Sequence, residues 1–233
     1  QMKLAALAIM LAPPVSAQEF SLLAGCEAYL TVQNSDCVVS HYFRCAEDLA
    51  GEQNHVSFPE NNTIYMGTID QEAQWIFSHH IADEITETLE LTPFDRASFS
   101  DLMAMGVDDF DFRTMSPEVG VTRYVGRDTL TGNQVVIDGV TLDETLYDLT
   151  AYLEDGSQTW QSQGHEFISR DRRMFLSGTG SITTLSDTFE TDGTPVQFIT
   201  PGEPGFLSIK PEFGCGVQMS VAPELQEYSH DSL

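Results

Sequence analysis

The rhythm of short extended segments after about residue 38 constrains the fold more than any other feature of the sequence. Residues 85–91 alternate apolar and polar side chains, the period of two that marks a strand with one solvated face. Turn dipeptides such as Asp138-Gly139 and Asp155-Gly156 separate these segments. Strands do not alternate with helices, so a parallel sheet is not expected. The sequence therefore predicts an antiparallel meander.

The predicted strands are 38–44, 63–69, 74–81, 85–91, 109–115, 121–127, 134–137, 140–153, 159–163, 165–169, 173–177, 181–185, 196–200, 206–210 and 213–221. Residues 140–153 also carry leucines at a helical spacing, but their Thr content and the preceding Asp-Gly favour a strand. A meander of this length must curl to bury its apolar face. We expect a mainly β fold: a single antiparallel meander curled into a half-barrel or barrel, with one or two short helices.

Residues 92–105 interrupt the strand pattern and predict one helix. Thr92 is a suitable N-cap, Pro93 fits the first turn, and Gly106 suits the C-terminal stop. Laid across the concave side of the sheet, this helix would enclose a cavity for an apolar ligand. The side chains predicted to line that cavity are Trp75, Phe77, Phe99, Leu102, Met103 and Met105.

The charge balance restricts the partners of the chain. The 233 residues carry a formal charge of −26, from 10 Lys and Arg against 36 Asp and Glu. So few cations exclude a general nucleic-acid binder, because phosphate contacts need Lys and Arg. They also argue against docking on anionic lipids. No linker or repeat divides the sequence, so we expect one β-rich domain over residues 18–233, with a polar tail at about 223–233.

Residues 1–17 have the three-part layout of a secretory signal peptide. Lys3 supplies a positive head, and residues 4–12 are apolar. Residues 15–17, Val-Ser-Ala, provide small side chains at the positions that signal peptidase recognises. The alternative is a buried N-terminal helix. The apolar run is too short to span a membrane. We therefore expect cleavage near Ala17 and a periplasmic or secreted protein without an integral membrane span.

The four cysteines, Cys26, Cys37, Cys45 and Cys215, predict two disulfides in an exported chain. Cys37 and Cys45 flank one predicted strand, so their Cα atoms lie too far apart to be bridged. We expect Cys215 to pair with Cys37 or with Cys45. The spacing contains no CxxC, so it predicts neither a structural metal site nor a redox-active pair.

A series of motifs between residues 107 and 153 resembles a known family. Residues 109–113 end in an Arg, Tyr124-Val125-Gly126 follows, and residues 135–142 read Val-Val-Ile-Asp-Gly-Val-Thr-Leu. This order resembles periplasmic lipoprotein carriers of the LolA type. The resemblance implies a curved antiparallel sheet, a helical lid, and binding of an acyl chain without catalysis. Under it, Arg44 is the nearest match to an Arg that contacts cargo; the alternative is an exposed salt-bridge partner.

Two groups of side chains are candidate metal ligands. His79 and His80 are neighbours on a predicted strand and point to opposite faces, so they cannot chelate one ion together. Asp108, Asp109 and Asp111 offer oxygen ligands for Ca²⁺, but the segment lacks the Gly and the terminal Glu of a calcium loop. Half-buried histidines and chance clustering of acids are the preferred interpretations, so no metal site is predicted.

The densest mixed-charge patch lies at residues 165–173. His165 and Glu166 diverge on a strand, which argues against an acid–base pair between them. Arg170, Arg172 and Arg173 form a basic patch that can bind an anionic group of a ligand or partner, or pair with the acids of the chain itself. Pairing with the chain's own acids is the favoured alternative.

No nucleophile or zinc-protease motif occurs, so neither a catalytic residue nor a cofactor is predicted. The leading hypothesis is an exported, non-enzymatic binding or carrier protein for an apolar ligand such as a lipid or acyl chain. The alternatives are an interaction module of the cell envelope with a protein partner, and a hydrolase or metalloenzyme whose site is assembled from distant residues.

Overall fold

The computed structural model describes residues 18–216. The strands are β1 Cys26–Asn34, β2 Val38–Cys45, β3 Gln53–Pro59, β4 Tyr65–Ile69, β5 Trp75–His80, β6 Ile85–Leu89, β7 Val107–Ser116, β8 Gly120–Ile137, β9 Val140–Leu153, β10 Gln158–Ser169, β11 Met174–Leu176, β12 Thr179–Thr184, β13 Thr188–Asp192 and β14 Pro195–Ile199. The single helix among the described residues is α1, Phe99–Met105. The mainly β fold class is therefore confirmed.

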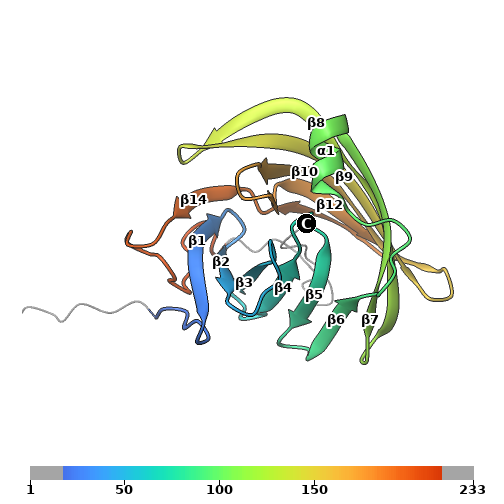
Figure 1. Cartoon of the computed structure of the whole chain (residues 1–233), viewed down its shortest axis with the longest axis horizontal. Helices are drawn as coiled ribbons and strands as arrows, with labels where there is room; N and C mark the ends of the chain where they lie inside the picture. The colour runs from blue at the N-terminus through green and yellow to red at the C-terminus, as the bar shows by residue number, and fades with distance from the viewer. Residues whose placement is uncertain (1–17, 217–233) are drawn as a thin grey trace, which may run out of the picture.

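One antiparallel sheet contains all of these strands. Its order is β13-β12-β10-β9-β8-β7-β6-β5-β4-β3-β2-β1-β14, and the short β11 pairs with β10. The sheet curls round on itself (Figure 1), yet it does not close, because β13 and β14 are its two edges. Only Gly193 and Thr194 join these edge strands along the chain. The predicted meander is thus an open, strongly curved sheet.

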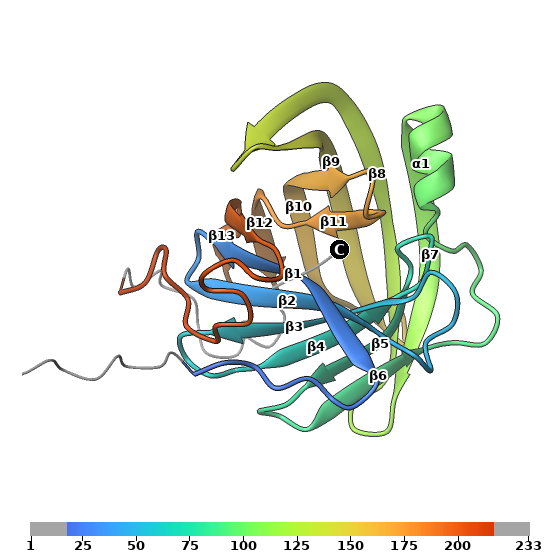
Figure 2. The same cartoon turned by 60° about the vertical axis from the view of Figure 1, so that its left-hand side comes forward.

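Most of the predicted strands are confirmed, and two pairs of them are continuous in the structure. Residues 159–163 and 165–169 form one strand, β10. Residues 121–127 and 134–137 belong to one long strand, β8, whose register shifts between Leu130 and Gln134. Residues 140–153, where the helical spacing was the alternative, form β9. The β8–β9 hairpin arches over one end of the sheet (Figure 2), and its Asp138 carboxylate accepts a hydrogen bond from the backbone N–H of Phe198 at 2.8 Å.

Two strands predicted near the C-terminus, residues 206–210 and 213–221, are wrong over the residues that the structure describes. Residues 206–210 contribute an isolated bridge between Ser208 and Glu19, not a strand. Residues 213–216 form a turn, and residues 217–221 lie outside the described residues. The Pro, Gly and Thr residues around position 203 direct the chain into tight turns, such as the Phe206 N–H to Glu203 carbonyl bond at 3.2 Å.

Helix α1 begins later than the sequence predicts. Thr92 is not its N-cap; the cap is Ser98, whose side chain accepts a hydrogen bond from the N–H of Asp101. The preceding residues stay extended because the backbone of Asp95 exchanges hydrogen bonds with that of Asp111 on β7. The C-terminus is as predicted: Gly106 adopts the left-handed conformation, with φ of 80°.

The interior beneath α1 is packed with side chains. Phe99 and Leu102 are buried against Ala73, Ile168 and Phe175. A second cluster fills the middle of the large β7–β10 face; its buried members are Phe110, Phe112, Tyr124, Leu149, Ala151 and Trp160. The core therefore fills the concave side of the sheet, where a ligand cavity was expected.

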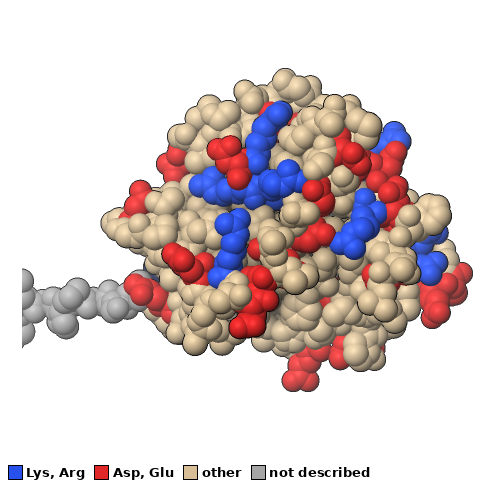
Figure 3. All heavy atoms as spheres, viewed as in Figure 1, with Lys and Arg blue, Asp and Glu red and all other residues tan. Residues whose placement is uncertain are grey.

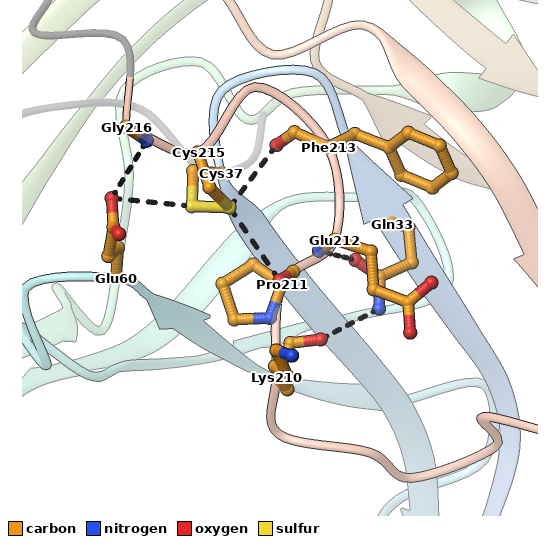
Figure 4. Close-up of a disulfide and its surroundings, with 9 residues drawn as sticks. All are labelled: Gln33, Cys37, Glu60, Lys210, Pro211, Glu212, Phe213, Cys215 and Gly216. Carbon is orange, nitrogen blue, oxygen red and sulfur yellow. Dashed lines mark hydrogen bonds between the residues drawn. A yellow bond between two sulfur atoms is a disulfide. The ribbon is translucent and has the colours of Figure 1, made fainter.

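Both disulfides fasten the N-terminal strands. Cys26 and Cys45 are direct cross-strand partners on β1 and β2. Cys37 bonds to Cys215, which confirms one of the two predicted partners of Cys215. Figure 4 shows how the Gln33 amide also holds the segment before Cys215: it donates to the carbonyl of Lys210 at 3.1 Å and accepts from the N–H of Glu212 at 2.9 Å.

Two disulfides are typical of chains that fold in an oxidising compartment outside the cytoplasm. Within residues 18–216, no helix is long and apolar enough to cross a membrane. The predicted signal peptide, residues 1–17, and the predicted polar tail, residues 223–233, lie outside the described residues.

Candidate functional site

A basic patch gathers at the α1 end of the molecule. The turn between β10 and β11 carries Arg170, Arg172 and Arg173, and the last residues of β2 bring Arg44 to the same place. On the face in Figure 3, basic side chains form a band across the centre, with acidic side chains around it. We call Arg44, Arg170, Arg172 and Arg173 the basic patch.

The buried amide of Gln53 on β3 holds this patch together. Its oxygen accepts hydrogen bonds from the hydroxyl of Tyr29 at 2.6 Å and from the guanidinium of Arg44 at 3.2 Å. Its nitrogen donates to the carbonyls of Arg172 and Arg173, at 2.9 and 3.3 Å. One side chain thereby ties the β10–β11 turn to β1 and β2, across more than a hundred residues of sequence.

The four arginines differ in how their charges are balanced. Arg170 forms an ion pair with Asp143, and Arg173 pairs with Glu72 at 2.9 Å. Neither Arg44 nor Arg172 has a carboxylate within ion-pair distance in the described part of the chain. The favoured prediction was that the arginines pair with the chain's own acids. It holds for Arg170 and Arg173, but not for Arg44 and Arg172.

Aromatic rings support two of the guanidinium groups. Arg44 lies 4.8 Å from the centroid of the Tyr29 ring, and Arg173 lies 4.7 Å from that of Phe99. Burial raises the pKa of Tyr29 to about 12, even though the nearby charges of Arg44 and Arg172 act to lower it. The Tyr29 hydroxyl is therefore a neutral donor at physiological pH.

Loss of the Gln53 amide should loosen this arrangement. The variant Gln53→Leu keeps the volume of the side chain but leaves the Tyr29 hydroxyl and the Arg172 carbonyl without their partner. We expect the free energy of unfolding to fall by roughly 1–3 kcal/mol. Urea unfolding followed by circular dichroism measures this loss. Gln197→Leu, on the half-buried edge strand β14, is the matched control and should cost less. An equal loss in both variants would contradict this role of Gln53.

The six side chains predicted to line one cavity lie in three different surroundings. Phe99, Leu102 and Met103 belong to the cluster beneath α1. Trp75 packs edge-on against the rings of Phe112 and Tyr124 in the second cluster. Phe77 and Met105 are on the surface, with exposed fractions of 38% and 66%. The structure does not bring these six side chains to one space.

Several spaces in the described part of the chain lie away from most of these six side chains. An interior space of about 10 Å³, lined by Asn34, Ser40, His55 and Ser57 among others, has room for about one water molecule. Two wide grooves of about 500 and 570 Å³ lie on the outer face, beside His165 and beside Arg113. A cleft of about 50 Å³ opens at the end of the sheet, over Trp160.

Three buried carboxyl groups on β7, β8 and β10 were not expected from the sequence. Asp108 and Asp128 are direct cross-strand partners, and both are buried. Glu166 is buried on the same inner face, and one oxygen each of Asp128 and Glu166 has no hydrogen-bond partner. Burial, strengthened by the charges of Asp108 and Asp148, raises the pKa of Asp128 to about 8. Burial, with the charge of Asp128, raises the pKa of Glu166 well above its usual range.

The remaining sequence candidates do not form a chemical site. His165 and Glu166 diverge as predicted, since the His165 ring lies on the outer face, 3.4 Å from the Glu144 carboxylate. Asp109 and Asp111 pair with Arg127 and Arg123. His79 bonds to the Thr86 hydroxyl and His80 packs on Tyr65. Within residues 18–216, no three His, Cys, Asp or Glu side chains are arranged to hold a metal ion.

Fold and site together define an open antiparallel half-barrel with a basic patch at one end. No family model, no curated protein and no solved structure matches this chain. The resemblance to lipoprotein carriers therefore stays a hypothesis.

Proposed function

We propose that this chain is an exported, non-catalytic binding protein that holds its ligand by an anionic group at the basic patch. The observation that carries the proposal is that Arg44 and Arg172 lack carboxylate partners although the chain has 36 acidic and only 10 basic residues. In so acidic a protein most cations have a carboxylate close by, so two guanidinium groups without one are available to bind an external anion.

The chemistry of the patch favours a carboxylate or phosphate group. A guanidinium offers two parallel N–H donors that match the oxygens of either group. Gln53 accepts a hydrogen bond from the Arg44 guanidinium and donates one to the backbone carbonyl of Arg172, so the Arg44 side chain and the backbone of Arg172 are held before the ligand arrives. The half-buried ring of Tyr29 offers apolar surface beside the charges.

Export and an acyl chain are the finer parts of the proposal. Export is supported by the signal-like residues 1–17 and by the two disulfides. An acyl ligand is supported by the resemblance to lipoprotein carriers. The interior beneath α1 is filled with side chains. The head group of an acyl ligand would therefore bind at the basic patch, and its tail could enter only if side chains moved.

Isothermal titration with acetate, inorganic phosphate and decanoate tests the proposal. We expect saturable binding that Arg172→Gln weakens by roughly tenfold or more, the usual loss of a charge-assisted hydrogen bond. Arg127→Gln removes the same charge from the outer face and should leave the affinity unchanged. Decanoate binding far more tightly than acetate identifies an acyl carrier. If none of the three anions binds, or if both variants behave alike, the proposal is wrong.

A further inference from the structure

The end of the sheet opposite α1 holds a small cleft with a different chemistry. Figure 2 shows α1 and the β8–β9 hairpin at one end of the molecule, and the turns after β5 and β7 at the other. The cleft of about 50 Å³ lies among these turns. The side chains that line it are His80, Ile85, Glu87, Val119, Thr122, Leu153, Thr159 and Trp160.

Glu87 is the only carboxylate in the lining of this cleft. One of its oxygens accepts hydrogen bonds from the hydroxyl of Thr114 at 2.7 Å and from that of Tyr124 at 3.4 Å. The other oxygen accepts a long bond of 3.4 Å from Ser78, its cross-strand partner on β5. Neutral hydroxyls thus orient the carboxylate, and within residues 18–216 no Lys or Arg forms an ion pair with it.

The walls of the cleft are apolar and its floor is aromatic. Trp160 is only 3% exposed and packs against Tyr124, with ring centroids 6.1 Å apart. Ile85, Val119 and Leu153 form the rim. A carboxylate set beside aromatic faces is the arrangement that proteins use to bind organic ammonium groups, because both attract a cation.

The titratable groups around the cleft do not compensate the negative charge of Glu87. Burial lowers the pKa of His80, against the opposing influence of Glu87 and Asp83, so this imidazole is largely neutral at physiological pH. Glu118, from the β7–β8 turn, accepts a bond from the N–H of Thr86 and adds a further negative charge to the same end. His79 bonds to Thr86 and is the remaining titratable group on β5 here.

We propose that this cleft binds the primary ammonium group of a small organic or peptide ligand, with Glu87 as its counter-ion and Trp160 beneath it. An anion is disfavoured by Glu87, and a neutral apolar group would leave the carboxylate without a charged partner. A metal ion is disfavoured because one carboxylate and one imidazole are too few ligands. The volume admits the head of the ligand only, so its body extends into solvent past Leu153.

Tryptophan fluorescence provides a direct test, because the chain has two Trp residues and both pack against Tyr124. The intact protein is titrated with n-butylammonium, and with 1-butanol and butyrate as neutral and anionic analogues. We expect a saturable change with n-butylammonium alone. Glu87→Gln should weaken it by roughly tenfold or more, whereas Glu190→Gln, the same charge change on exposed β13, should leave it unaltered.

A second variant separates loss of binding from loss of folding. Leu153→Phe leaves Glu87 intact, narrows the cleft and adds no Trp, so it should also weaken the response, and circular dichroism reports whether each variant is folded. Butanol binding as tightly as butylammonium, a folded Glu87→Gln protein that binds normally, or no saturable response in the wild type would each overturn the proposal. None of these results bears on the basic patch, because Arg44 and Arg172 lie at the other end.

Discussion

Raising the pH from about 4 to about 8 is expected to destabilise the folded protein by several kcal/mol. Asp128 has its pKa raised from 3.8 to about 8 by burial and by the neighbouring charges of Asp108 and Asp148. Between these two values the unfolded chain has released a proton that the folded chain still holds. Stability therefore falls as the pH rises, by about 1.4 kcal/mol per pH unit for each such group, and levels off above the folded pKa.

Glu166 and Asp108 act in the same direction. Burial raises the pKa of Glu166 well above its usual range and that of Asp108 to about 6. Carboxylates whose pKa is lowered, such as Asp143 beside Arg170, oppose this trend only at low pH, because their stabilisation is lost as the pH falls through the folded pKa. The maximum of stability should therefore lie on the acidic side of neutrality.

Urea unfolding at pH 5 and pH 8 measures the effect. Asp128→Asn cannot ionise, so this variant should gain stability relative to the wild type at pH 8 and change little at pH 5. Glu190→Gln removes one negative charge from the exposed strand β13 and serves as the control for overall charge. A wild type equally stable at both pH values would contradict the burial of Asp128 and Glu166.

Loss of the Cys37–Cys215 disulfide is expected to cost about 5 kcal/mol, and loss of Cys26–Cys45 about 3 kcal/mol. The difference arises because the first bond closes a loop of 178 residues and the second one of 19. A longer loop restricts the unfolded chain more, and the free energy of unfolding falls accordingly when the bond is removed.

The two double variants, Cys37→Ala with Cys215→Ala and Cys26→Ala with Cys45→Ala, serve as controls for each other. Both are compared with the wild type by denaturant unfolding under oxidising conditions. The Gln33 bonds to Lys210 and Glu212 should keep the C-terminal segment partly in place in the first variant. A smaller loss for Cys37–Cys215 than for Cys26–Cys45 would show that chain entropy does not govern the outcome.

The sequence predicted most of the strands that alternate or follow a clear turn, and it missed β1, β3 and β13. Residues 85–91 and 140–153 alternate or follow a clear turn, so their pattern was readable. Strand β1 is buried on both faces over its C-terminal half, and β3 carries buried polar residues such as Gln53 and His55, so neither shows a simple period of two. The start of α1 was missed because the pairing of Asp95 with Asp111 overrides the local capping signal.

The candidate sites could be predicted only in part. Arg172 and Arg173 stand out as neighbours in the sequence, but Gln53, which holds them, is 119 residues away from Arg172 and carries no local signal. For Glu87 a signal was present: it occupies the apolar face of an alternating strand, where an acid needs an explanation. Asp128 and Glu166 are inward-facing in the same way, but their burial depends on how far the sheet curls.

A double-mutant cycle on Arg44 and Arg172 tests the central claim most directly. The affinity for inorganic phosphate is measured for the wild type, Arg44→Gln, Arg172→Gln and the protein with both changes. If one anion contacts both guanidinium groups, each single change weakens binding roughly tenfold and the double change costs less than the two together. Losses that simply add would show that the two guanidinium groups do not share one anion, and affinities no different from that of Arg127→Gln would show that the basic patch is not an anion site.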